Sequence, residues 1–235
     1  ILFRASYQLA GTTTARIGLF QLTGERVQLT WSAERALPSL AAATDFPEFG
    51  IDNQGVIYFV AVDAVSRNLY RTDPATPPVK VFATDDSFDN STINQVGTLA
   101  VSPAGPAAFR IILRNNAQHI VRIVGGQTQT LAAAGNNTVI GVSSTGAVLF
   151  VGNYRNQGQG IYRWQGDDVT LMLRQGAATP NGQTVRAFDS AHVTAQGELY
   201  AHVRTTTNDL VLLQPTGPAP LLVEAGQRVN VTASV

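Results

Sequence analysis

The sequence predicts an all-β fold and, within that class, a β-propeller built from four-stranded blades. A turn motif recurs four times along the chain, and each copy is followed by further short apolar stretches separated by turn residues. Hydrophobic residues make up 44% of the 235 residues and charged residues only 14%. This composition favours a folded chain over a disordered one.

The turn motif consists of a small polar residue, a glycine three positions later, and an aromatic on the apolar stretch that follows. The polar side chain can accept a hydrogen bond from the backbone N–H two residues on, and the glycine supplies the positive φ of a tight hairpin. The four copies are GIDNQGVIYFVAV (50–62), AVSPAGPAAFRIIL (100–113), GVSSTGAVLFVGN (141–153) and HVTAQGELYAHV (192–203). The aromatics are Phe59, Phe109, Phe150 and Tyr200. The glycines are spaced 50, 41 and 51 residues apart, which is typical of propeller blades.

Two more apolar stretches complete each repeat. The third strands are expected at 68–73, 119–124, 160–165 and 209–214, and the fourth at 79–83, 129–133, 169–173 and 220–224. Several strands are apolar at nearly every position, as in VIYFVAV. Such runs suit sheets that are packed on both faces, as stacked blades are.

The two ends of the chain look like complementary halves of one more blade. Residues 1–49 hold three expected strands, ILFRASY, RIGLFQL and RVQLTWS, and VNVTASV follows the last repeat. We therefore expect a single five-bladed domain in which the C-terminal strand pairs with the N-terminal one. The expected blades are 1–33 plus 229–235, 45–84, 96–133, 138–175 and 187–225. The alternative is a fragment of a longer chain with six to eight blades.

The motifs resemble two groups of bacterial repeats. The signature at 102–109, followed by IVR and a Gly-Gly turn, resembles the repeats of the Tol-system propeller and its WD-like relatives. The run at 173–201, with its Gly-x-x-x-Pro-x-Gly loop at 176–182 and Phe188, more closely resembles tandem repeats of large secreted bacterial proteins of unassigned function. That resemblance implies an extracellular or cell-surface location, with the periplasm as the alternative. It carries over no catalytic residue.

The charge balance and the absence of cysteine exclude several functions. The 16 basic and 16 acidic residues cancel, so nothing in the net charge favours nucleic acid or an anionic membrane as a partner. The chain has no cysteine, which excludes disulfides, thiolate metal sites and cysteine nucleophiles. No apolar run reaches the roughly 18 residues of a membrane span, so we expect no membrane insertion in this segment.

Candidate binding residues recur on the third strands. Arg71, Arg122 and Arg163 hold equivalent places and could form a ring of guanidinium groups that binds an anionic glycan. Alternatively, they point outward and pair with neighbouring acids or lie across exposed aromatics. Tyr162 and Trp164 flank Arg163, and aromatics with polar tips are common at sugar and protein contacts.

Calcium is the one cofactor considered. Asp85, Asp86 and Asp89 could bind it through carboxylate oxygens, but the loop lacks the spacing of the usual calcium loop, so a solvated loop is the alternative. His119, His192 and His202 have no metal-site spacing, and satisfied or exposed histidines are expected.

A five-bladed glycoside hydrolase would need two carboxylates roughly 5–9 Å apart. The inner-strand carboxylates Asp45, Glu48, Asp52 and Asp189 form no repeated set, and Asp52 is accounted for as a turn cap. We therefore expect a non-enzymatic extracellular binding or assembly module that contacts a protein, a surface polysaccharide or copies of itself. The alternative is a glycan-active or glycan-binding propeller, that is, a glycoside hydrolase or a lectin.

Overall fold

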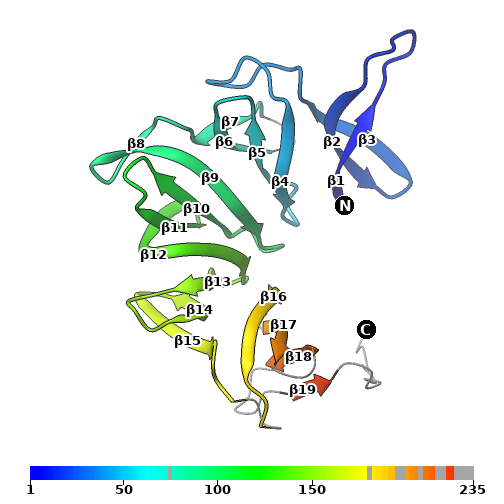
Figure 1. The fold of residues 1–235 in the computed structure, drawn as a ribbon. Coiled ribbons are helices and arrows are strands. Elements are labelled where there is room, and N and C mark those ends of the chain that lie inside the picture. The colour runs from blue at the N-terminus through cyan, green and yellow to red at the C-terminus, as the bar shows by residue number, and fades with distance from the viewer. Residues whose placement is uncertain (74–75, 179–181, 194–198, 206–208, 215–220, 225–235) are drawn as a thin grey trace.

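The computed structural model describes residues 1–73, 76–178, 182–193, 199–205, 209–214 and 221–224. Every regular element in these residues is a β-strand in an antiparallel sheet, which confirms the all-β prediction (Figure 1). The described part of the chain offers no helix of the length and apolar character that crossing a membrane requires.

The strands form small sheets in chain order. β1 (Leu2–Tyr7), β2 (Arg16–Thr23) and β3 (Arg26–Ser32) make sheet I, and β4 (Asp45–Ile51), β5 (Ile57–Val62), β6 (Arg67–Thr72) and β7 (Val79–Phe82) make sheet II. An eight-stranded sheet then runs through β8 (Ser87–Phe88), β9 (Ser91–Val101), β10 (Ala107–Leu113), β11 (Gln118–Val124), β12 (Gln127–Val142), β13 (Val148–Asn153), β14 (Gln159–Gln165) and β15 (Asp168–Arg174). The last sheet, which we call sheet V because the eight-stranded sheet is divided into two below, contains β16 (Val185–Val193), β17 (Leu199–Thr205), β18 (Asp209–Gln214) and β19 (Leu221–Glu224).

The long strand β12 divides the eight-stranded sheet into two halves. Residues 127–133 pair with β11, and the rest of β12 pairs with β13 through a register that shifts after Ala134 and again after Val139. We call β8 to β11 with the first half of β12 sheet III, and the second half of β12 to β15 sheet IV. In Figure 1 the five sheets follow one another around an arc, with sheets I and V on the same side of the picture.

The hydrophobic core is divided among the boundaries between successive sheets. Strand β5 shows why, because five of its six residues are buried. Phe59 packs with residues of sheet I and Val60 with residues of sheet III, so both faces of sheet II are covered. Further clusters join sheet III to IV around Phe150 and sheet IV to V around Ile161.

The turn motif forms as predicted at Asp52 and Ser102, whose side-chain oxygens accept hydrogen bonds from the backbone N–H two residues on, at 2.9 and 3.3 Å. Ser143 differs, because its hydroxyl accepts from Ala147 four residues on, at 3.0 Å. Gly55 and Gly105 have the positive φ values, 84° and 110°, that the hairpins require. The expected ring closure through 229–235, and the fourth turn at 194–198, lie outside the described residues.

One predicted aromatic lies on the other face of its strand. Phe59, Phe109 and Phe150 are fully buried, whereas Tyr200 is 38% exposed. Tyr200 stands three residues after its turn glycine and the others stand four, so strand alternation turns it outward and buries Ala201 in its place.

Candidate functional site

The recurring arginines of the third strands occupy the same position in successive sheets. Arg71, Arg122 and Arg163 pair across the sheet with Tyr58, Ala108 and Leu149, each of which stands three residues after a turn glycine. Gln21 is the corresponding residue of sheet I, since it lies opposite Gln28 as Arg122 lies opposite Gln129. The surroundings of these side chains nevertheless differ from one sheet boundary to the next.

Arg122 is buried and links sheet III to sheet IV. Its Nε donates to Gln129 at 2.7 Å, and its terminal nitrogens donate to the carbonyls of Gly146 at 3.2 Å and Gly166 at 2.8 Å. The guanidinium carbon lies 4.0 Å from the centre of the Trp164 ring. Burial lowers the pKa of Arg122 from its ordinary value, with the charge of Asp167 acting in the opposite direction. These contacts make Arg122 a crosslink between sheets.

The two predicted aromatic contacts belong to the same buried boundary. Tyr162 is fully buried, donates to the Gly158 carbonyl at 2.6 Å, and stacks on Phe150 with ring centres 5.3 Å apart. Trp164 is only 4% exposed. Arg163, which lies between them in sequence, lines a separate cavity of about 240 Å³. Tyr162 and Trp164 thus occupy the core, where they present almost no surface to a ligand.

Arg71 lies in an open groove between sheets II and III, which we call the Arg71 groove. The cavity there measures about 520 Å³. Its polar side chains come from both sheets and are Asp52, Gln54, Tyr58, Arg71 and Thr128. The rest of the wall consists of small and apolar residues, namely Val56, Val81, Ala104, Gly105, Ile123, Gly125 and Gly126.

The Arg71 groove contains one cation and one anion. Burial raises the pKa of Tyr58, and the neighbouring Arg71 guanidinium opposes that shift. The Asp52 carboxylate accepts hydrogen bonds from the backbone N–H groups of Gln54 and Val56, each at 2.9 Å. A ligand in this groove therefore meets hydrogen-bond donors and acceptors whose positions are set by strand register and turn geometry.

The boundary of sheets II and III differs from that of sheets III and IV at the residue that follows the recurring arginine. At the boundary of sheets III and IV, Trp164 covers the Arg122 guanidinium. Ile123 holds the equivalent place in sheet III, one residue after the recurring arginine, and Thr72 holds it in sheet II. Ile123 is much smaller than tryptophan and lines the Arg71 groove. The difference between Trp164 and Ile123 thus separates a filled boundary from an open one.

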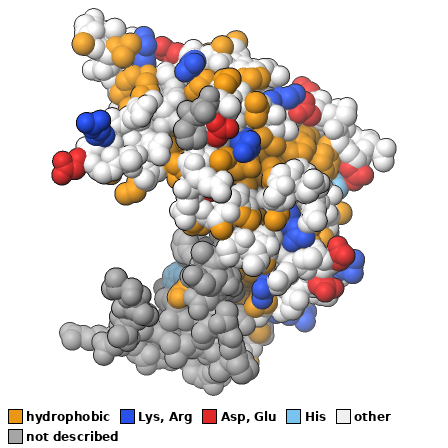
Figure 2. All heavy atoms as spheres, turned by 180° about the vertical axis from the view of Figure 1, so that it is seen from behind, with side chains coloured by type: hydrophobic (Ala, Val, Ile, Leu, Met, Phe, Trp, Pro, Cys, Tyr) orange, Lys and Arg blue, Asp and Glu red, His pale blue; other side chains and the backbone are white. Residues whose placement is uncertain are grey.

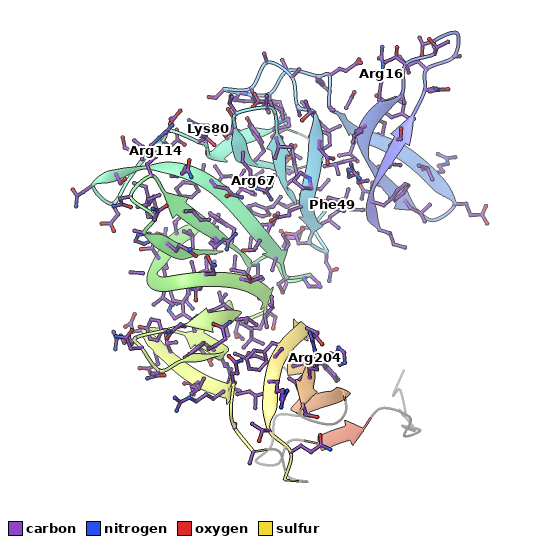
Figure 3. All side chains as sticks on the ribbon, in the orientation of Figure 1. Arg16, Phe49, Arg67, Lys80, Arg114 and Arg204 are labelled. Carbon is purple, nitrogen blue, oxygen red and sulfur yellow. The ribbon has the colours of Figure 1, made fainter. Side chains whose placement is uncertain are left out.

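The three acids considered for calcium are each held by a different basic side chain. Asp85 pairs with Arg114, Asp86 with Lys80 at 2.8 Å, and Asp89 with His119 at 3.3 Å; Figure 3 labels Arg114 and Lys80. Among the described residues no three histidine, aspartate or glutamate side chains gather closely enough to hold a metal ion.

Glu48 also has a structural position, between sheets II and III. Its carboxylate pairs with Arg67, which Figure 3 labels, and accepts a hydrogen bond from the Leu99 N–H at 2.6 Å. Arg67 in turn donates through Nε to the Val96 carbonyl at 2.5 Å. The carboxylate therefore joins the inner strands β4 and β9.

The other inner-strand carboxylates are likewise engaged. Asp45 pairs with Arg4 of sheet I. Asp189 pairs with Arg204 at 2.5 Å, and this hydrogen bond lowers the pKa of Asp189. His202 lies 3.8 Å from the same carboxylate, and the His192 side chain lies outside the described residues. On the face seen in Figure 2, basic and acidic side chains are interspersed.

The sequence pointed to Arg71 and named Asp52 as a turn cap, but it did not point to Tyr58 or Thr128. Tyr58 holds the repeat position of Ala108 and Leu149, so a polar aromatic at that place in one repeat was the available signal. Thr128 carried no such signal, because its place in the groove depends on how sheet III packs against sheet II.

Comparison with known proteins leaves the family open. No protein-family model matches the chain, and no curated protein matches it.

Proposed function

We propose that the chain is a five-bladed β-propeller in which sheets I to V are the blades. The support is the arc of five sheets and the presence of a separate hydrophobic cluster at each boundary between neighbours. In this proposal VNVTASV at 229–235 pairs with the free edge of β1 and closes the ring. Deleting 229–235 should then lower the melting temperature. An unchanged melting temperature would contradict the closure.

We further propose that this propeller is a non-enzymatic binding module, located at a bacterial cell surface or secreted, as the repeat resemblance implies. The Arg71 groove carries the proposal. Arg71 donates hydrogen bonds, Asp52 accepts them, and the hydroxyls of Tyr58 and Thr128 can do both. A simple anion is repelled by Asp52 and a simple cation by Arg71. Carbohydrate hydroxyls both donate and accept, so a surface polysaccharide suits this groove best.

A glycan array tests the proposal directly. The purified protein should label a restricted set of glycans, equally with calcium and with EDTA. Arg71→Ala should abolish that labelling, because it removes the cation of the groove and its hydrogen-bond donors. Arg163→Ala is the matched control, since it removes the equivalent arginine from a different cavity. A silent array, or labelling that survives Arg71→Ala, would contradict the proposal.

A specific observation favours assembly with other copies as the second candidate. Strand β3 is the edge of sheet I, and Val27 and Leu29 on it are 59% and 40% exposed. An edge strand with exposed apolar side chains can pair with another chain. Light scattering would then show a dimer that Val27→Lys converts to a monomer. A monomer at all concentrations would contradict this candidate.

The hydrolase alternative has less support, because Asp45, Glu48 and Asp189 are each paired with an arginine. Incubating the protein with any glycan found on the array, and measuring released reducing ends, tests it.

A further inference from the structure

A second groove lies on the other face of sheet II. It is a cavity of about 420 Å³ between sheets I and II, which we call the Trp31 groove. Its polar and aromatic lining includes Gln21, Gln28, Trp31, Arg35, Thr72 and Asp73. Gln21 holds the repeat position of Arg71, and Thr72 holds that of Ile123 and Trp164. The Trp31 groove is therefore the Arg71 groove displaced by one sheet.

The two grooves are neighbours at the same end of sheet II. Successive residues of a strand point to opposite faces of the sheet. Tyr58 and Arg71 accordingly line the Arg71 groove, whereas Ile57 and Thr72 line the Trp31 groove. The β4–β5 turn contributes to both, with Gln54 on one side and Gly55 on the other. Since packed sheets lie about 10 Å apart, an extended ligand that crosses this turn can enter both grooves.

The chemistry of the Trp31 groove matches that of its neighbour. It too contains one cation and one anion, Arg35 and Asp73. The Arg35 guanidinium lies 4.2 Å from the centre of the Trp31 ring, a contact that orients its donors. The amides of Gln21 and Gln28 add groups that both donate and accept hydrogen bonds. As in the Arg71 groove, hydroxyl groups fit this set better than a simple ion does.

We infer that the two grooves are adjacent subsites for one linear carbohydrate chain that crosses the β4–β5 turn. The inference rests on the proposed function of the Arg71 groove and adds that the ligand is a polymer. A chain that reaches both grooves binds its second subsite at a high effective concentration. Affinity should therefore rise steeply with chain length, and the rise should be lost when the Trp31 groove is altered.

Calorimetric titration with defined oligosaccharides tests this. The probes are cello-, malto-, manno- and chito-oligosaccharides of two and six units. We expect the six-unit member of one series to bind on the order of 100-fold more tightly than its two-unit member, the lower end of the usual gain from linked sites. Arg35→Glu, which reverses the cation of the Trp31 groove, should reduce that gain to under threefold. The control Arg26→Glu changes an exposed arginine of β3 outside the groove and should retain the full gain.

A second variant separates this inference from the proposed function. Ile123→Trp places in the Arg71 groove the side chain that covers Arg122 at the next boundary, and should weaken binding of both lengths at least tenfold. Suppose that Ile123→Trp weakens binding, but the six-unit probe binds no more tightly than the two-unit probe, or the gain in affinity survives Arg35→Glu. The second subsite is then refuted and the proposed function stands. If no oligosaccharide binds, or Ile123→Trp has no effect, both fail. Circular dichroism and the melting temperature establish that each variant is folded.

Discussion

Replacing Arg122 by alanine removes the crosslink between sheets III and IV, and its cost follows from the contacts. Three hydrogen bonds of 2.7, 2.8 and 3.2 Å are lost, while the contact to the Trp164 carbonyl at 3.5 Å is too long to add much. A hydrogen bond from a charged donor contributes about 1.5–3 kcal/mol net, and a guanidinium over a tryptophan ring about 0.5–2 kcal/mol.

Burial opposes these gains. The lowered pKa of Arg122 means that the folded protein disfavours the charged guanidinium relative to water. Arginine nevertheless stays charged at any pH used for such a measurement, so this cost is the same throughout and adds no pH dependence. After the cost of burying the guanidinium is subtracted from the gain of its contacts, we expect Arg122→Ala to lower the free energy of unfolding by about 3 kcal/mol. This value lies within the range for breaking a buried charge network.

Urea denaturation followed by tryptophan fluorescence measures this loss. In a chain of this size it corresponds to a fall in melting temperature of about 6–12 °C. Arg163→Ala is the matched control, because Arg163 holds the same repeat position but is half-buried and lines a cavity, and it should cost under about 1 kcal/mol. If the two variants lose the same free energy, Arg122 is no crosslink, and our explanation of why its boundary is filled fails.

Three further predictions concern other contacts. Gly152→Ala should lower the free energy of unfolding by about 1–3 kcal/mol in the same denaturation assay, because a Cβ at this position would overlap the side chain of buried Asn137. A loss below about 0.5 kcal/mol would refute this prediction. Asp52→Ala should cost more than Ser102→Ala, because Asp52 accepts two backbone hydrogen bonds at 2.9 Å and Ser102 one at 3.3 Å; equal costs would contradict it. The hydrogen bond from the Val65 N–H is the main cause that lowers the pKa of Asp63 in the folded protein. The ionised Asp63 therefore stabilises the folded protein above the pKa that it has in the unfolded chain, and this contribution is lost as pH falls through its pKa in the folded protein. Asp63→Asn should therefore flatten the acid side of the stability curve, and an unchanged curve would count against it.

Local pattern was enough to predict the all-β class and the positions of many strands. The polar residue and glycine of each turn act within four residues of one another, as the hydrogen bonds of Asp52 and the positive φ of Gly55 show. Apolar stretches such as β5 predicted burial on both faces of the sheet, because successive side chains of a strand point to opposite faces.

What the sequence could not predict depends on packing between sheets. Arg71 and Arg122 look equivalent in the sequence, yet one lines a groove and the other is buried. The deciding residues lie on the next sheet, 52 positions further along for Arg71 and 42 for Arg122, at Ile123 and Trp164. The sequence around each arginine therefore does not show whether that arginine will be buried, because this depends on a residue of the neighbouring sheet.

In the propeller that we propose, the same difference would allow one boundary between blades to hold a site and another to be filled. Strands and turns of neighbouring sheets form the walls of the grooves at the boundaries I–II and II–III, and the side chain after the recurring arginine is one difference from the filled boundary of sheets III and IV. Tryptophan fills the boundary of sheets III and IV, whereas isoleucine and threonine leave cavities of about 520 and 420 Å³ at the two preceding boundaries. If this reasoning holds, Trp164→Ile should expose the Arg122 guanidinium and create a third groove beside the other two. In the function that we propose, the ligand-binding face would then be set by a few substitutions at one position of each sheet, with the strands that form the core left unchanged.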